Sequence, residues 1–221
     1  MSKDHGHKRY DLIIFDWEGT LGDTIGQALY RIAVEASKGA LGSNAINEET
    51  VRLNLLQAAK GFFPNWSDEQ LEQFCLRKSV SSDVEPSGIY LLPGAKILIE
   101  RLSDAGINLA IASNKGQQSL QSALKRSALQ PFFRVTRSAG QTPPKPCPQM
   151  LDEILTEFLL TPADALMIGD SVSDIEMAKQ IGMDAVGFDY YHQNTQELLA
   201  AGALFVFDNY PDVAQFLNLG S

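Results

Sequence analysis

The chain has 221 residues, of which 44% are apolar and 20% charged, a composition typical of a folded globular protein. This composition excludes a disordered or fibrous protein. The formal net charge is −9, so no basic field attracts a nucleic-acid backbone or an anionic lipid surface, and we expect neither nucleic acid nor membrane as a partner.

The N-terminal segment and the cysteines indicate the compartment. Residues 1–10 are charged, and no apolar stretch long enough for a signal sequence or a membrane span follows them. The only cysteines are Cys75 and Cys147, which are too few for a disulfide scaffold or a closed zinc site. We therefore expect a cytoplasmic protein.

The first strand is predicted over residues 10–15, and a long helical interval follows it. From about residue 24 to 92 the apolar residues recur at helical spacing. They form three stripes: Ile25, Leu29, Ile32 and Ala36; Val51, Leu55, Ala58 and Phe62; and Leu71, Phe74 and Cys75 with Lys78. Turn residues at 19–22 and 92–94 border the interval, which favours an inserted helical subdomain. Alternatively, these helices pack directly on a sheet.

Strand-like runs and helical patterns alternate through the rest of the chain, which is typical of a parallel sheet with helices on both faces. The predicted strands are 107–112, 133–137, 165–168, 184–188 and 204–207, and the predicted helices are 117–127, 148–160, 174–181, 195–200 and 213–217. The predicted fold class is therefore α/β, a doubly wound parallel sheet with an inserted helical cap. Residues 1–22 and 93–221 would form the core and residues 23–92 the cap.

Polar residues follow several of these strands, where open α/β sheets bind ligands. They are Asp16 and Glu18 after the first strand, Ser113 and Asn114 after the second, Asp170 and Asp174 after the strand over 165–168, and Lys145 before the helix over 148–160. Because the carboxyl ends of parallel strands share one edge of the sheet, we expect these side chains to form one site.

The two strand-end carboxylates indicate phosphoryl transfer with a metal. Asp16 is the predicted nucleophile, since a carboxylate held at a strand end is ionised at neutral pH and can form an acyl phosphate that water hydrolyses. Asp16 and Asp170 would repel each other, which implies a divalent cation, most naturally Mg²⁺. Asp174 would hold a metal-bound water or pair with Lys145, or it is simply a first-turn acid favoured by the helix dipole.

The remaining residues suit the phosphoryl oxygens and the proton transfers. Ser113 can donate a hydrogen bond to a phosphoryl oxygen, and Lys145 can neutralise its charge. Asn114 would help to position the substrate, although a Ser-Asn pair is also typical of a helix cap. Glu18 is the predicted general acid for the leaving oxygen, and then the base that activates water.

Together these segments resemble the four motifs of the haloacid dehalogenase superfamily, in the branch with a helical cap and nearest to its phosphoglycolate phosphatase-like members. The segments are Asp16-Trp17-Glu18-Gly19-Thr20-Leu21, Ser113, Lys145 and Gly169-Asp170-Ser171. The resemblance implies Mg²⁺-dependent hydrolysis of a small phosphate monoester, and it adds the backbone carbonyl of Glu18 to the metal ligands. Glu18 departs from the aspartate that is commoner in the family.

Two alternatives to the phosphatase stay open. A phosphomutase of the same superfamily would return the phosphoryl group to another hydroxyl of the substrate. A regulatory protein would keep the fold and the metal site but turn over weakly, because the extra methylene of Glu18 misplaces its carboxyl group. The expected partner is a small phosphorylated metabolite, and the pattern specifies no oligomeric partner.

Overall fold

The computed structural model describes residues 9–41, 48–80 and 91–219, and the chain divides into two compact units. The first unit, here called the core unit, contains Met1–Gly22 and Leu91–Ser221, and the second, the helical unit, contains Asp23–Tyr90. The role of the helical unit as a cap stays a prediction.

The core unit is built on a parallel sheet whose strands appear in the order β3-β2-β1-β4-β5-β6. The strands are β1 (Leu12–Phe15), β2 (Asn108–Gly116), β3 (Val135–Ala139), β4 (Ala165–Gly169), β5 (Asp184–Phe188) and β6 (Val206–Phe207). The predicted α/β class with a parallel sheet is confirmed. β2 runs four residues beyond its predicted end at residue 112, so that Ser113 and Asn114 lie within the strand.

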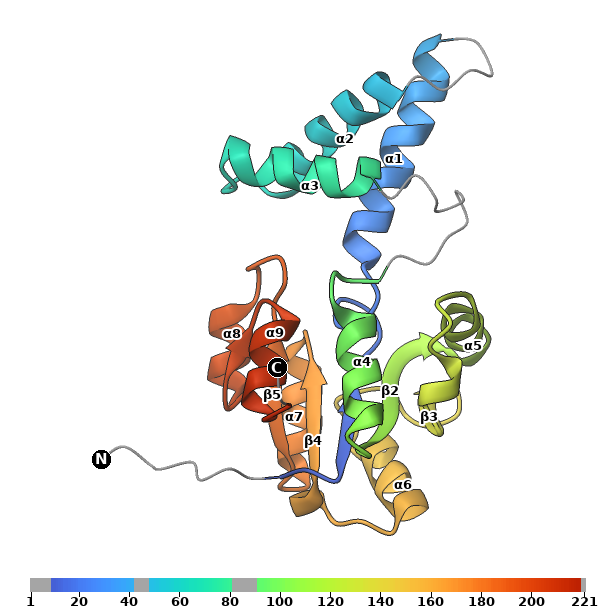
Figure 1. The fold of residues 1–221 in the computed structure, drawn as a ribbon, viewed down its shortest axis with the longest axis vertical. Helices are drawn as coiled ribbons and strands as arrows, with labels where there is room; N and C mark the ends of the chain where they lie inside the picture. The colour runs from blue at the N-terminus through green and yellow to red at the C-terminus, as the bar shows by residue number, and fades with distance from the viewer. Residues whose placement is uncertain (1–8, 42–47, 81–90, 220–221) are drawn as a thin grey trace, which may run out of the picture. The chain divides into compact units, whose positions relative to one another are not determined.

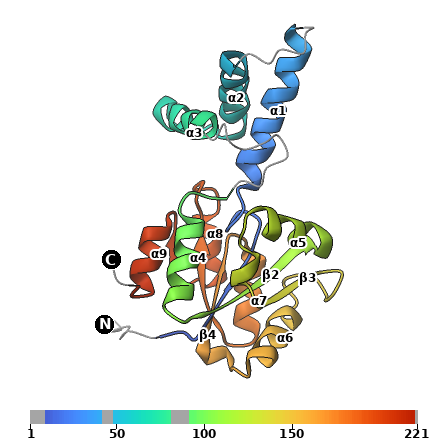
Figure 2. The same ribbon diagram turned by 45° about the vertical axis from the view of Figure 1, so that its right-hand side comes forward.

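Helices cover both faces of this sheet (Figures 1 and 2). They are α4 (Ala95–Asp104), α5 (Gln117–Arg126), α6 (Gln149–Phe158), α7 (Val172–Gln180), α8 (Thr195–Ala201) and α9 (Tyr210–Phe216). α4 lies outside the predicted helices, although its buried residues Ala95, Leu98, Ile99 and Leu102 have helical spacing. α4 packs beside α9, and α6 and α7 contribute to the core on the opposite face.

The central strands are buried on both faces. All four residues of β1 and all five of β4 are buried, as is typical of parallel strands between two helical layers. Leu12 and Ile14 of β1 pack in one cluster with residues of α6 and α7. β1 and β4 are neighbours at the point where the strand order reverses, and ligands bind at the carboxyl ends of such strands.

The helical unit contains α1 (Thr24–Leu41), α2 (Glu48–Phe62) and α3 (Asp68–Val80), with α2 packed against both of the others. The buried stripes of α1 and α2 differ in part from the predicted ones. α1 buries Ala33 instead of Ile32, which is 57% exposed, and α2 buries Ala59 instead of Ala58. The true stripes advance by four residues at these points, where the prediction had advanced by three.

The apolar residues of the stripe predicted over α3 are buried. They are Leu71, Phe74 and Cys75, and the side chain of Lys78 lies outside the described residues. Within the described ranges, no helix is long and apolar enough to cross a lipid bilayer.

Candidate active site

The loop after β1 is tightly folded and carries Asp16 at its start. The backbone N–H of Asp16 donates to the carbonyl of Ile168 over 2.9 Å, so Asp16 continues the pairing of β1 with β4. The carbonyl of Trp17 accepts from the backbone N–H groups of Leu21 and Gly22, at 3.0 and 2.7 Å. This folding holds the carboxylate of Asp16 in a buried position at the strand end.

Gly19 lets this loop approach the end of β4. Its φ is +77°, and a Cβ at this position would lie 2.0 Å from Oδ2 of Asp170. A side chain at residue 19 would therefore be strained and would displace Asp170. The close approach also brings Oγ1 of Thr20 to 3.5 Å from Oδ1 of Asp170.

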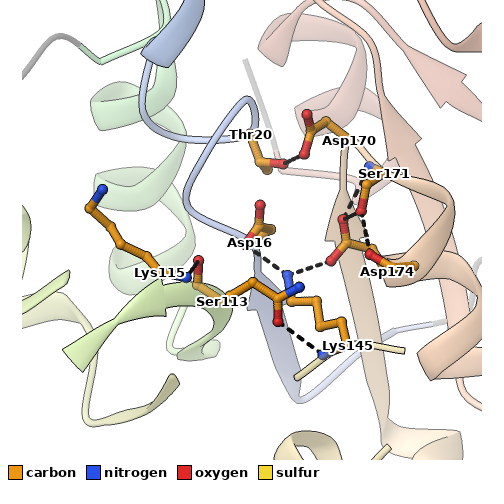
Figure 3. Close-up of polar contacts among 10 residues, drawn as sticks. Asp16, Thr20, Ser113, Lys115, Lys145, Asp170, Ser171 and Asp174 are labelled. Atoms are coloured by element: carbon orange, nitrogen blue, oxygen red, sulfur yellow. Dashed lines mark hydrogen bonds and ion pairs between the residues drawn. The ribbon is translucent and has the colours of Figure 1, made fainter. Parts of the chain in front are cut away.

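Lys145 is the buried cation of the site. Its Nζ donates to Oδ1 of Asp16 over 2.7 Å and to Oδ1 of Asp174 over 2.5 Å, and its side chain is 2% exposed (Figure 3). Burial lowers the pKa of Lys145, but the negative charges of Asp16 and Asp174 outweigh burial and raise it above its ordinary value. Lys145 is therefore a charged ammonium shared by two carboxylates.

Three carboxylates gather around this lysine. Asp16, Asp170 and Asp174 each offer an oxygen, and these oxygens all lie within 4.8 Å of one another. Burial, and then the charges of Asp16 and Asp174, raise the pKa of Asp170 to about 8. One ammonium does not compensate three carboxylates, and clustered carboxylate oxygens are the ligands that a hard divalent cation takes. The donor set thus fits Mg²⁺.

The carboxylate of Asp174 has two partners, Lys145 and Ser171, and therefore fills two of the roles considered for it. Its Oδ1 accepts from Lys145, and its Oδ2 accepts from the backbone N–H and the hydroxyl of Ser171, at 3.1 and 2.7 Å. Asp174 therefore pairs with Lys145 and also caps the start of α7. Its contact with a metal-bound water stays a prediction.

The end of β2 supplies the other predicted residues. Ser113 is 1% exposed, and its Oγ accepts from the backbone N–H of Lys115 over 3.3 Å. Asn114 Oδ1 accepts from the backbone N–H of Lys145 over 2.9 Å. Asn114 thus fixes the segment that carries Lys145, and its action on a substrate stays a prediction.

The carboxylate of Glu18 is not one of the three clustered carboxylates and has Lys115 as its partner. Its Oε1 accepts from Nζ of Lys115 over 2.8 Å, and its side chain is 46% exposed. Figure 3 shows the Lys115 side chain extending away from Asp16, on the side opposite to Lys145. The predicted metal contact of Glu18 runs through its backbone carbonyl, so the position of its carboxylate does not test that contact.

Sequence reasoning did not single out three residues that contact the site. Lys115 directly follows Asn114, and its positive charge next to a predicted site residue could have marked it as a candidate. Thr20 belongs to the Asp16 segment. Tyr210, at the start of α9, donates its hydroxyl to the carbonyl of Thr20 across 190 residues, and no local pattern marks such a contact.

The chain is similar to known proteins over most of its length. Residues 13–188 match the family described as haloacid dehalogenase-like hydrolase. A phosphoglycolate phosphatase of Vibrio parahaemolyticus is 24% identical, over 95% of this chain and 97% of the relative. A haloacid dehalogenase superfamily hydrolase from Ehrlichia chaffeensis has a TM-score of 0.64 at 22% identity, covering 96% of this chain and 97% of that one. CbbY from Rhodobacter sphaeroides in complex with phosphate has a TM-score of 0.61 at 23% identity, covering 95% and 100%. The resemblance predicted from the four motifs is confirmed.

Proposed function

Because this chain belongs to the haloacid dehalogenase-like hydrolase family and is a phosphatase of that family, we propose that it hydrolyses a small phosphate monoester through an aspartyl phosphate on Asp16. One observation carries the proposal: a buried lysine and three carboxylates meet at the carboxyl ends of β1 and β4, with Lys145 Nζ 2.7 Å from Asp16 Oδ1. Since similar proteins are phosphoglycolate phosphatases, 2-phosphoglycolate is the first substrate that we propose.

The reaction proceeds in two steps that use the residues named above. A carboxylate oxygen of Asp16 attacks phosphorus, the bond from phosphorus to the leaving oxygen breaks, and Glu18 gives its proton to that oxygen. Water then attacks the phosphorus of the aspartyl phosphate while Glu18 takes a proton from it. Inorganic phosphate leaves and the Asp16 carboxylate is restored. Lys145 and the hydroxyl of Ser113 bind the phosphoryl oxygens in both steps.

Mg²⁺ is the cofactor of this proposal. The residues that would hold it are Asp16 and Asp170, with the backbone carbonyl of Glu18, and with Asp174 through a water. When bound, the ion supplies positive charge to the carboxylates and to the phosphoryl oxygens. The surroundings of Asp170 support this assignment, because burial, and then the charges of Asp16 and Asp174, raise its pKa to about 8, and a bound cation would favour its ionised form.

We expect phosphate release to require Mg²⁺. The purified protein is incubated with 2-phosphoglycolate, with other small phosphorylated metabolites and with an aryl phosphate, and inorganic phosphate is measured. Chelation should lower the rate by roughly 100-fold or more, because the clustered carboxylates then repel the anionic substrate, and added Mg²⁺ should restore it. A rate unchanged by chelation contradicts the metal assignment, and no release from any substrate contradicts the phosphatase.

The products of the same incubations separate the phosphatase from the phosphomutase. A phosphatase accumulates inorganic phosphate and the dephosphorylated alcohol. A mutase converts a sugar phosphate to an isomer without net release, which ³¹P NMR detects. We expect inorganic phosphate as the product.

Substitutions of Glu18 test its acid and base role. Glu18→Gln cannot transfer a proton and should lower kcat by roughly 100-fold, whereas Glu18→Asp keeps the carboxyl group and should slow turnover less. Since the side chain is 46% exposed, both variants should unfold at the wild-type urea concentration. If Glu18→Asp were the slower variant, Glu18 would not perform the proton transfers.

A further inference from the structure

The cation that contacts Glu18 is Lys115, and its backbone is held at a strand irregularity. β2 pairs with β3 through Ser113 and Ser138, and the next pair, Gly116 with Ala139, is shifted in register. Such a bulge redirects the side chains that it carries. The backbone N–H of Lys115 also donates to Ser113 Oγ, so the start of its side chain is fixed next to the candidate site.

Glu18 needs a partner to hold its carboxylate in one place. The backbone of Glu18 is fixed, since it forms a bridge with Gly22 and the loop closes on the carbonyl of Trp17. The side chain has one more rotatable bond than aspartate, and it is half exposed. Lys145 is already engaged by Asp16 and Asp174, so the 2.8 Å contact with Lys115 Nζ is what restrains Glu18.

The Glu18 carboxylate is thus paired with Lys115 and not with the buried Lys145, which Asp16 and Asp174 engage. In phosphoryl transfer the attacking and leaving oxygens lie on opposite sides of phosphorus. An acid for the leaving oxygen must therefore lie on the side of phosphorus opposite to the nucleophile. The Lys115 side chain extends away from Asp16 in Figure 3. Its Nζ donates to Oε1 of Glu18 over 2.8 Å. Because the Lys115–Glu18 ion pair is partly exposed, it contributes little to the free energy of unfolding. Its effect is therefore on the orientation of the Glu18 carboxylate.

We propose that Lys115 is a positioning residue that holds the Glu18 carboxylate for proton transfer to the leaving oxygen and from water. The inference rests on the proposed function and adds a residue to it. Lys115 itself touches neither the nucleophile nor the reacting phosphorus in this assignment, and it acts only through Glu18.

The test is a double-mutant cycle on phosphate release with Mg²⁺. Lys115→Met should lower kcat about tenfold with KM within about twofold of wild type, because orientation is lost and binding is not. Lys115→Arg keeps a cation at this place and should recover most of the rate. In the Glu18→Gln background, Lys115→Met should change kcat by less than about twofold, because no carboxylate is left to position. The control is Lys125→Met, which removes one positive charge from an exposed position in the last turn of α5. This variant should have the kcat and KM of wild type.

Several outcomes would overturn the inference. An equal loss in the wild-type and Glu18→Gln backgrounds would mean that Lys115 acts directly on the phosphoryl charge. A raised KM with unchanged kcat would make it a substrate-binding residue, and unchanged kinetics would give it no role. If the wild-type protein releases no phosphate at all, the proposed function fails first and this inference falls with it, whereas an active wild type with a failed cycle overturns the inference alone.

Discussion

Asp16→Asn is expected to lower phosphate release by roughly 10⁴-fold or more, because an amide oxygen carries no negative charge and is a poor nucleophile toward phosphorus. The substitution is nearly isosteric, and the amide oxygen can still accept from Lys145 Nζ, which lies 2.7 Å from Asp16 Oδ1. The substitution also removes one of the three negative charges in the cluster of Asp16, Asp170 and Asp174. The folded state should therefore be at least as stable as wild type, which urea unfolding measures beside initial rates of phosphate release.

The matched control for this variant is Asp11→Asn. Asp11 is exposed, directly precedes β1 and contributes its backbone N–H and carbonyl to the described contacts with Asp164 and Asn108. This variant should keep the wild-type rate. Equal rates for Asp16→Asn and wild type would end the covalent mechanism on Asp16. A variant that loses its rate because it is unfolded would be recognised by its urea transition.

Lys145→Met should lower both stability and activity. It removes a cation that is 2% exposed and takes from Asp16 and Asp174 the ammonium that compensates their charges. Breaking a buried ion pair on one side costs roughly 3–5 kcal/mol, so the urea midpoint should fall clearly. Phosphate release should fall by roughly 1000-fold, because the ammonium would also stabilise the transferred phosphoryl group.

Mg²⁺ provides an internal check on this second prediction. Since the ion would bring positive charge to the same carboxylates, it should stabilise Lys145→Met against urea by more than it stabilises wild type. Lys125→Met is the control for loss of one positive charge. A Lys145→Met protein with the wild-type midpoint would show that Asp16 and Asp174 do not depend on this lysine for charge compensation.

The strand predictions were accurate where a run of apolar residues is buried on both faces. The strand over Asp184–Phe188 was placed with the correct bounds, and each of the other strands agrees with its prediction within a few residues. The prediction that the second strand ends at residue 112 was wrong because Ser113 and Asn114 are polar. Their backbones continue the strand nevertheless, since the sheet pairing extends to Gly116.

The interval was correctly predicted as helical, but the buried faces of α1 and α2 were predicted only in part. An alternation of three and four residues describes several faces of a helix equally well when alanines are frequent, and only packing against a neighbour selects one of them. α1 buries Ala33 and exposes Ile32, and α2 ends with Phe62 exposed while the adjacent Phe63 is buried. Hydrophobicity alone would have reversed the first of these assignments.

The sequence alone predicts that Asp16, Ser113 and Asp170 lie at one edge of a sheet, because buried runs alternating with helices form parallel strands whose carboxyl ends share that edge. Which charges meet depends on the assembled fold. Lys145 reaches Asp16 across 129 residues of chain, and Lys115 reaches Glu18 across 97. Strand order and side-chain direction set these pairings, and both arise only when the whole sheet is assembled.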